Sequence, residues 1–234
     1  MCGRLLLKSN YDEIKLAMAL EDISMPNLEP SWNVAPTQDV LVARMHPKSR
    51  RRVSDKMHWG LIPAWAKEAK MPGPTFNAVS ETIDQKPTFR DAWRAGRRCL
   101  VIADGFYEWR KAEDKQPFLI RRKDRQLTVM AGIWEIWGGG ASGEIKRSCT
   151  ILTTAPNALI TALPHDRMPV ILDEADWAVW LGDTPGDDAA IKALMKPCPA
   201  DAMELWPVDA RVGDWRNNDA RLMERVPEAV PLLL

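Results

Sequence analysis

The chain has 234 residues, a length that suits one large domain or two small ones with a sizeable core. Its 32 lysines and arginines equal its 32 aspartates and glutamates, so the formal net charge is zero. This composition argues against a protein that binds nucleic acid through bulk positive charge, and any anion site must be a local patch.

The few metal-binding residue types are scattered. No two of the four cysteines form a Cys-X-X-Cys pair, and the chain contains only three histidines. We therefore expect neither a metal site nor a cofactor. The N-terminus lacks a signal-peptide pattern, and no stretch approaches the roughly 20 apolar residues of a membrane span. These absences predict a cytoplasmic protein with reduced thiols, associated with the nucleoid if the source is bacterial, and no membrane partner.

In the first half of the chain, apolar spacing predicts one helix and a pair of strands. Ser9 precedes the helix, and Asp12 completes a predicted capping box. In chain order, the predicted elements are a helix at 11–20, a Pro-rich ordered loop at 25–37, a strand at 39–45, a basic turn at 48–52 and a return strand at 53–60.

The second half alternates more strands with short helices. A helix at 89–96 stops at Gly96, and the turn at Asp104 and Gly105 joins two strands within 97–111. Further strands are predicted at 116–122, 127–137, 147–154 and 203–208, a hairpin loop at 138–144, and helices at 157–163, 174–181 and 189–195. This order predicts a single α+β domain over residues 1–234, with a curved, largely antiparallel, barrel-like sheet and peripheral helices.

Cys2 directly follows the initiator methionine. Its small side chain permits removal of Met1, which would leave an amine and a thiol on one residue. Unperturbed, these groups titrate near ~8 and ~8.5, so both would be partly available as nucleophiles at neutral pH. The alternative is that position 2 simply holds a small residue.

Three polar residues lie in segments rich in aromatic residues or proline. Asn77 lies in FNAVSET, Glu108 in GFYEW and His165 in PHDRMP. Each has a structural alternative: a turn cap, the polar face of an edge strand and a helix C-cap, respectively. Together with Cys2, they supply an amide, a carboxylate, an imidazole and an aminothiol, which suffice for carbonyl or acyl chemistry.

These segments resemble the SOS-response-associated peptidase (SRAP) family, whose members shield abasic sites in single-stranded DNA. The resemblance rests on Met1–Arg4 and on five ordered motifs that span most of the chain: Trp32–Gln38, Trp59–Trp65, Asn77–Thr82, Ala103–Trp109 and His165–Leu172.

The resemblance implies a covalent reaction at the N-terminus. The Cys2 amine adds to the aldehyde of an opened abasic sugar, and the thiol then closes a thiazolidine ring. Glu108 matches the family's catalytic carboxylate, His165 the imidazole that assists ring opening, and Asn77 the amide that holds the Cys2 end. If Met1 were retained, the Cys2 nitrogen would be an amide, and the chain would not react with an aldehyde.

The resemblance also implies a single-stranded DNA interface. Arg4 and Arg167 match phosphate contacts, whereas Trp109, Trp65 and Pro36 would stack on bases or wedge beside the lesion. Thr153 matches a threonine that lines the pocket, with Thr154 as a close alternative.

One position departs from the family pattern. The family usually has arginine two residues after the motif asparagine, where this chain has Val79. This predicts weaker binding on one flank of the DNA, or compensation by Arg90, Arg97 or Arg98.

Two other functions compete with this interpretation. One is a thiol hydrolase that uses Cys2 as its nucleophile; the other is a non-catalytic binding module in which Cys2 has no role. The resemblance and the lack of a coiled-coil pattern lead us to expect a monomer.

Overall fold

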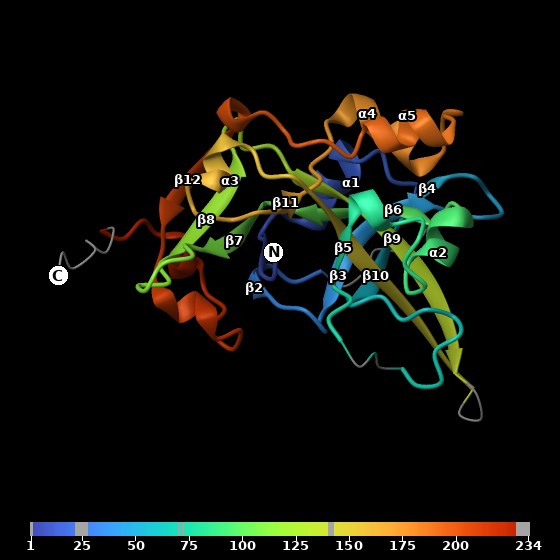
Figure 1. Ribbon diagram of the computed structural model, residues 1–234, viewed down its shortest axis with the longest axis horizontal. Helices are drawn as coiled ribbons and strands as arrows, with labels where there is room; N and C mark the ends of the chain where they lie inside the picture. Colours follow the sequence, from blue (N-terminus) through green and yellow to red (C-terminus); the bar gives the residue numbers. More distant parts are fainter. Residues whose placement is uncertain (1, 22–27, 70, 72, 140–142, 228–234) are drawn as a thin grey trace.

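The computed structural model describes residues 2–21, 28–69, 71, 73–139 and 143–227. Figure 1 shows two twisted sheets with short helices around them. The predicted α+β class, with a largely antiparallel barrel-like sheet, is confirmed. Part of the predicted Pro-rich loop (25–27) and the middle of the predicted hairpin loop (140–142) lie outside the described residues.

The larger sheet closes into a five-stranded barrel. Its order is β11-β10-β4-β3-β6-β9, and β9 pairs again with β10; β5 joins the end of β10. β4 and β5 run parallel to β10, whereas the other pairs are antiparallel. The strands are β3 (Asp39–Met45), β4 (Arg52–Trp59), β5 (Asn77–Val79), β6 (Arg98–Ala103), β9 (Thr128–Gly139), β10 (Glu144–Thr154) and β11 (Met168–Pro169).

A glycine allows β9 to pair closely with two neighbouring strands, β6 and β10. Gly132 lies opposite Cys99 of β6 and Ile151 of β10. A Cβ atom at this position would lie 2.9 Å from the Thr150 carbonyl oxygen and 3.0 Å from the Cys99 sulfur. Only glycine permits this close approach, which closes the barrel.

The smaller sheet has the order β12-β8-β7-β1-β2. Its strands are β1 (Leu5–Leu7), β2 (Ser31–Val34), β7 (Gly105–Trp109), β8 (Pro117–Arg122) and β12 (Met203–Pro207). No sequence pattern predicts β1, and β2 falls within the predicted Pro-rich loop. The predicted turn at Asp104 and Gly105 joins β6 to β7, but the two strands do not pair, because the chain crosses from one sheet to the other at Asp104.

Within the described residues, five short α-helices lie outside the sheets: α1 (Tyr11–Ala17), α2 (Arg90–Arg94), α3 (Ala158–Thr161), α4 (Glu174–Leu181) and α5 (Asp188–Ala193). The predicted capping box at Ser9 and Asp12 was wrong. Asn10 caps α1 together with Glu13, because Ser9 instead donates to the buried carboxylate of Asp104 through its backbone N–H and its hydroxyl.

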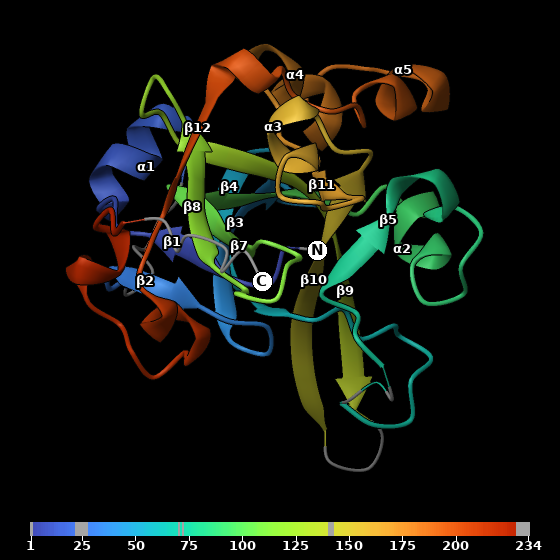
Figure 2. The same ribbon diagram turned by 60° about the vertical axis from the view of Figure 1, so that its left-hand side comes forward.

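Alternate residues of the barrel strands face two different cores. Leu41 and Ala43 pack with the helices, whereas Val40 and Val42 pack toward the smaller sheet. We call this second cluster the inter-sheet core; it also contains Cys2, Leu5, Met57, Trp59, Cys99, Val101, Phe106, Ile120, Met130, Cys149 and Ile151. Figure 2 shows that the start of the chain lies between the two sheets. No helix within the described ranges is long and apolar enough to cross a membrane.

Candidate active site

The pairing of β1 with β7 brings the N-terminal residues beside Glu108. Leu5 lies opposite Phe106, and the Tyr107 N–H donates to the Arg4 carbonyl at 3.0 Å. The same antiparallel register, continued backwards, would place Gly3 opposite Glu108 and Cys2 opposite the next residue, Trp109. Glu108 shares a face of β7 with Phe106, which belongs to the inter-sheet core together with Cys2.

Asn77 holds the backbone of Cys2. Its side-chain Nδ2 donates to the Cys2 carbonyl oxygen at 2.7 Å. β5 positions this amide because it pairs with β10, with Asn77 opposite Ile151 of the inter-sheet core. The Oδ1 atom of Asn77 is buried, and no group of the described residues hydrogen-bonds to it. The amide thus fixes Cys2 and leaves one buried acceptor for an incoming group.

Glu108 and His165 form a buried pair. Their side chains are 4% and 6% exposed, and Glu108 Oε2 lies 3.6 Å from His165 Nε2. The same Nε2 atom lies 2.6 Å from the Trp109 carbonyl oxygen, which can only accept, so Nε2 carries the proton. Nδ1 is buried without a hydrogen-bond partner in the described part of the chain. Nδ1 is therefore the nitrogen available for exchanging a proton with a bound molecule.

The Cys2 thiol is fully buried in this site. Burial, and next the negative charge of Glu108, raise the pKa of the thiol well above its ordinary value. The ordinary thiol value used in the sequence analysis therefore does not apply to this buried position. The thiol must transfer its proton to a neighbouring base before it can attack.

Thr153 and Thr154 point to opposite faces of β10. The Thr153 hydroxyl donates to the Ala78 carbonyl oxygen at 3.3 Å, next to Asn77. The Thr154 hydroxyl donates to the Met195 carbonyl oxygen at 3.0 Å, on the side of α5. Of the two alternatives left by the sequence, Thr153 therefore lies on the side of the site.

The two arginines predicted to bind phosphate are engaged within the protein. Arg167 makes two hydrogen bonds to Glu81, at 2.8 and 2.7 Å, and lowers the pKa of that carboxyl to about 2. It also contacts Thr153. Arg4 donates to the carbonyl oxygens of Gly3 and Gly213, at 2.9 and 3.0 Å. No role was predicted for Glu81, although it lies in the same motif as Asn77.

The predicted stacking residues differ in exposure. Trp65, after β4, is 55% exposed and donates to the Pro87 carbonyl oxygen at 3.3 Å. Pro36 is half-buried and lines a hollow of about 280 Å³ together with Phe76, the residue before Asn77. Trp109 is half-buried and packs on the opposite face of β7 from Glu108. The structure therefore places Trp65 at the surface and Pro36 beside the Asn77 strand.

The family model of the SOS response associated peptidase (SRAP) matches residues 1–215. The chain belongs to the SRAP family. It is 38% identical over 228 residues to the abasic site processing protein YoqW of Bacillus subtilis, covering 96% of this chain and 99% of that protein. It is 32% identical to the abasic site processing protein HMCES of Xenopus tropicalis, covering 97% of this chain and 78% of that protein.

Solved structures share the fold of this SRAP chain. A crystal structure of a Bacteroides thetaiotaomicron protein superposes with a TM-score of 0.84 at 25% identity, covering 97% of this chain and the whole of that one. A second, from Bordetella bronchiseptica, gives a TM-score of 0.75 at 26% identity and covers 89% of this chain.

Val79 departs from the SRAP motif, and the three candidate compensating arginines differ in their surroundings. Arg97 is paired with the buried carboxylate of Glu135. Arg98 donates to the Trp180 carbonyl oxygen in α4. Arg90 is half-buried, contacts Asp91 at 3.3 Å and lies three residues after Pro87, whose carbonyl oxygen accepts from Trp65. Arg90 is therefore the candidate of the three that lies next to a predicted DNA-contacting residue.

Proposed function

We propose that this chain processes abasic sites in single-stranded DNA by forming a covalent crosslink through Cys2 after removal of Met1, and thereby protects the lesion. The names of its SRAP relatives support abasic-site DNA as the target. The observation that carries the proposal is the 2.7 Å hydrogen bond from Asn77 to the Cys2 carbonyl, beside the Glu108–His165 pair. Met1 itself lies outside the described residues.

The proposed reaction has two bond-forming steps. The Cys2 amine attacks C1′ of the open-chain sugar, and loss of one water molecule gives an imine. The thiol sulfur then adds to the same carbon while its proton passes to the imine nitrogen. The product is a five-membered thiazolidine ring with the combined mass of protein and DNA minus water. An internal cysteine cannot close this ring, because its nitrogen is an amide.

The neighbouring side chains supply the proton transfers. His165 Nδ1 takes the proton of the C1′ hydroxyl and returns it to the ring oxygen as the bond between them opens to give the aldehyde, since Nε2 is committed to the Trp109 carbonyl. Glu108 moves the proton from the thiol to the imine nitrogen, because its carboxylate lies close enough to raise the thiol pKa. Asn77 holds the Cys2 carbonyl and thereby keeps the α-amine in one position. This lowers the entropic cost of bringing the amine to the aldehyde carbon.

The proposed DNA interface combines phosphate contacts with base stacking, as is typical of proteins that bind single strands. Arg4 and Arg167 would contact phosphates, Trp65 and Trp109 would stack on bases, and Pro36 would separate the bases beside the lesion. Because the chain has no net charge, few phosphates are contacted, and affinity should fall only gradually with salt.

The thiol-hydrolase alternative would use the same Cys2 thiol as its nucleophile. Burial and Glu108 raise the pKa of this thiol, so in either function it must first give its proton to a base. Blocking the α-amine while leaving the thiol free separates the two functions. It abolishes the crosslink but leaves thiol hydrolysis intact.

Intact mass under denaturing conditions tests the proposal. Protein without Met1 is mixed with a single-stranded oligonucleotide that carries one abasic site, beside an undamaged control. We expect an adduct of protein plus oligonucleotide minus water, absent from the control and from Cys2→Ala. Lack of that adduct with protein that has lost Met1 contradicts the proposal.

A further inference from the structure

A short repeat lies near the C-terminal end of the described chain and was missed in the sequence analysis. The pattern Asp-X-Arg occurs three times at five-residue spacing, at 209–211, 214–216 and 219–221. In each copy, Oδ1 of the aspartate accepts from the backbone N–H of the arginine two residues later, at 2.8, 3.0 and 3.0 Å. These are three consecutive Asx turns, and we call residues 209–223 the repeat loop.

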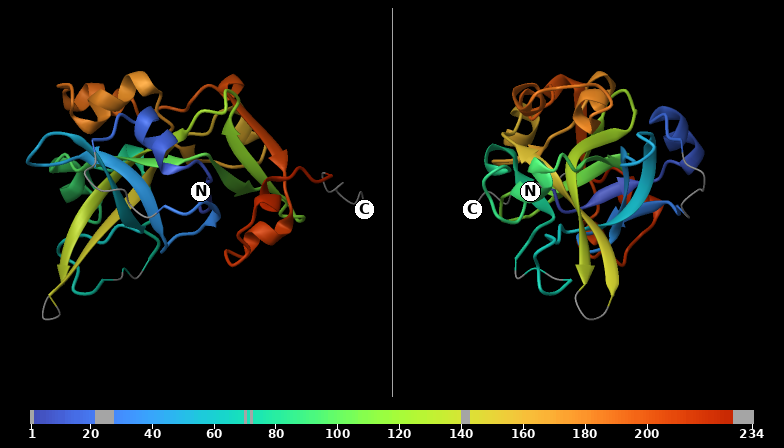
Figure 3. Two further views of the ribbon diagram at one scale, coloured as in Figure 1. Left: turned by 180° about the vertical axis from the view of Figure 1, so that it is seen from behind. Right: turned by 90° about the vertical axis from the view of Figure 1, so that its right-hand side faces the viewer.

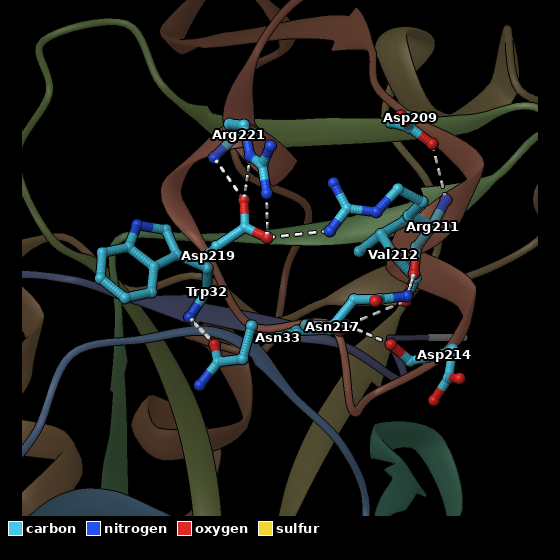
Figure 4. A network of polar contacts seen from close by, with 10 residues as sticks. Trp32, Asn33, Asp209, Arg211, Val212, Asp214, Asn217, Asp219 and Arg221 are labelled. Carbon is cyan, nitrogen blue, oxygen red and sulfur yellow. Dashed lines mark hydrogen bonds and ion pairs between the residues drawn. The ribbon is translucent and has the colours of Figure 1, made fainter.

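The arginines of the repeat loop are paired with its aspartates. Arg216 contacts Asp214 at 2.7 Å, and both Arg211 and Arg221 contact Asp219, at 2.8 and 3.1 Å. Figure 4 shows Asp219 between its two arginines. Each positive charge of the loop therefore has a carboxylate beside it, and the loop is a rigid frame rather than a basic patch.

The repeat loop is also fixed to β2. Asn33 Nδ2 lies within hydrogen-bond distance of the carbonyl oxygens of Val212, Asp214 and Asn217, at 3.1, 3.0 and 2.9 Å (Figure 4). The Trp32 N–H donates to Asn218 Oδ1 at 2.6 Å. One buried side chain thus holds three points of the loop backbone, and the loop geometry is determined before any partner arrives.

The middle repeat presents a tryptophan to solvent. The X position is alanine in the outer copies, Ala210 and Ala220, but Trp215 in the middle one. Trp215 is 52% exposed, whereas the apolar side chains of Val212 and Leu222 are buried. Packing of the loop therefore does not require the indole ring, and a large exposed aromatic on a rigid backbone is typical of a stacking platform.

Arg4 connects the repeat loop to the active site. Arg4 lies two residues after Cys2, and its Nη2 donates to the carbonyl oxygen of Gly213, two residues before Trp215. On each side of this hydrogen bond, the two intervening residues span at most about 7 Å. Trp215 therefore lies within a few nucleotides of Cys2 along an extended strand. The repeat loop and the segment after β4 that carries Trp65 lie on opposite sides of the start of the chain (Figures 2 and 3).

We propose that Trp215 stacks on one nucleobase of the single strand, on the flank of the abasic site that passes Arg4. The inference rests on the proposed function and adds Trp215 to its stacking residues, Trp65 and Trp109, on the side opposite Trp65. A nucleobase suits this ring because the contact needs a flat apolar face and no charge, and the arginines of the repeat loop are already paired.

The test uses oligonucleotides that carry a tetrahydrofuran abasic analogue, which has no aldehyde and binds without crosslinking. The analogue is placed at the 5′ end or at the 3′ end, so that the bases extend on one flank only. Affinity is measured by fluorescence anisotropy of the labelled oligonucleotide for wild type, Trp215→Ala and Trp215→Phe. Leu16→Ala, on α1 and 86% exposed, is the control for removal of an exposed apolar side chain.

We expect Trp215→Ala to bind one of the two oligonucleotides about 5- to 50-fold more weakly, with the slope of affinity against salt unchanged, because no phosphate contact is lost. Trp215→Phe should retain most of the affinity, and Leu16→Ala all of it. Equal affinity of wild type and Trp215→Ala, or an equal loss for both oligonucleotides, overturns the inference.

The wild-type adduct with a true abasic oligonucleotide is measured in the same series. If wild type forms no adduct, the proposed function fails. If wild type forms the adduct while Trp215→Ala binds both analogues as wild type does, the stacking inference fails alone.

Discussion

Arg167 binds both carboxylate oxygens of Glu81, at 2.8 and 2.7 Å. A phosphate that reaches Arg167 must therefore compete with a carboxylate. We predict that Glu81→Gln, which keeps the size and removes the charge, raises the affinity for single-stranded DNA about two- to fivefold at low salt. The slope of log affinity against log salt should also steepen by about 0.7, the value for one further phosphate contact on a single strand.

Glu204→Gln is the matched control for this prediction, because Glu204 pairs with Arg121 at 2.8 Å on the smaller sheet, in β12. It removes the same charge from a similar ion pair and should leave the DNA affinity unchanged. If both substitutions raise the affinity equally, the effect is one of net charge and does not come from freeing Arg167.

The same ion pair predicts a pH-dependent contribution to stability. The pKa of Glu81 is about 2 in the folded protein, below its ordinary value of 4.5, so the folded state binds fewer protons there than the unfolded state. The contribution is therefore complete above about pH 4.5 and disappears as the pH falls to about 2. Urea unfolding of wild type and Glu81→Gln at several pH values measures it. The difference between the two should be constant above pH 5 and shrink below it; a difference that grows on acidification contradicts the assignment.

Asn77→Ala tests whether the hydrogen bond to the Cys2 carbonyl positions the reacting amine. The substitution leaves the amine and thiol in place but removes the donor that holds them. At saturating abasic oligonucleotide, the rate of adduct formation should fall about tenfold, as for the loss of one buried hydrogen bond. Asn10→Ala is the control, because Asn10 caps α1 and contacts no residue of the site. Equal rates for wild type and Asn77→Ala would remove the positioning role.

Glu108→Gln should change two properties of Cys2 in opposite directions. The negative charge of Glu108 is the second-largest cause, after burial, of the raised thiol pKa, so its removal lowers that pKa and raises the thiolate fraction at a given pH. Alkylation of Cys2 by iodoacetamide at pH 8 should therefore become faster, as measured by peptide mass mapping. Crosslinking should instead slow about 10²- to 10⁴-fold, because the proton carrier is lost.

Cys198, whose pKa is raised by burial and then by Asp173, is the internal reference for alkylation. Slower alkylation of Cys2 in the variant would contradict a charge effect.

The sequence predicted the elements whose pattern is local and missed those that depend on distant partners. The strand at 39–45 and the helix at 174–181 were predicted with their observed bounds, because apolar spacing and end signals lie within the segment. β2 was placed in a loop because its strand character comes from pairing with β1, whose three residues show no pattern of their own. The capping residue was misplaced because Ser9 has a better acceptor in Asp104, far away in the chain.

The same division holds for the site. Cys2, Asn77, Glu108 and His165 could be chosen from their residue types and motifs, but no local pattern shows that Asn77 binds the Cys2 carbonyl or that burial raises the thiol pKa. The partners of Arg4 and Arg167 were missed for the same reason. A surface arginine in a sequence carries no mark of the carbonyl or carboxylate that the fold places beside it.

Val79→Arg tests the departure from the family motif. Val79 is half-buried on β5 opposite Thr153, two residues before Glu81, so an arginine there would lie beside the Glu81–Arg167 pair. It could either contact a phosphate itself or bind Glu81 and release Arg167, and both routes add one cation to the same flank of the DNA. We predict a higher affinity for single-stranded DNA and a salt slope steeper by about 0.7. Val79→Gln, of similar length and uncharged, should change neither. Affinity of Val79→Arg equal to that of wild type would show that position 79 does not determine DNA affinity in this chain, and that the valine needs no compensating cation such as Arg90.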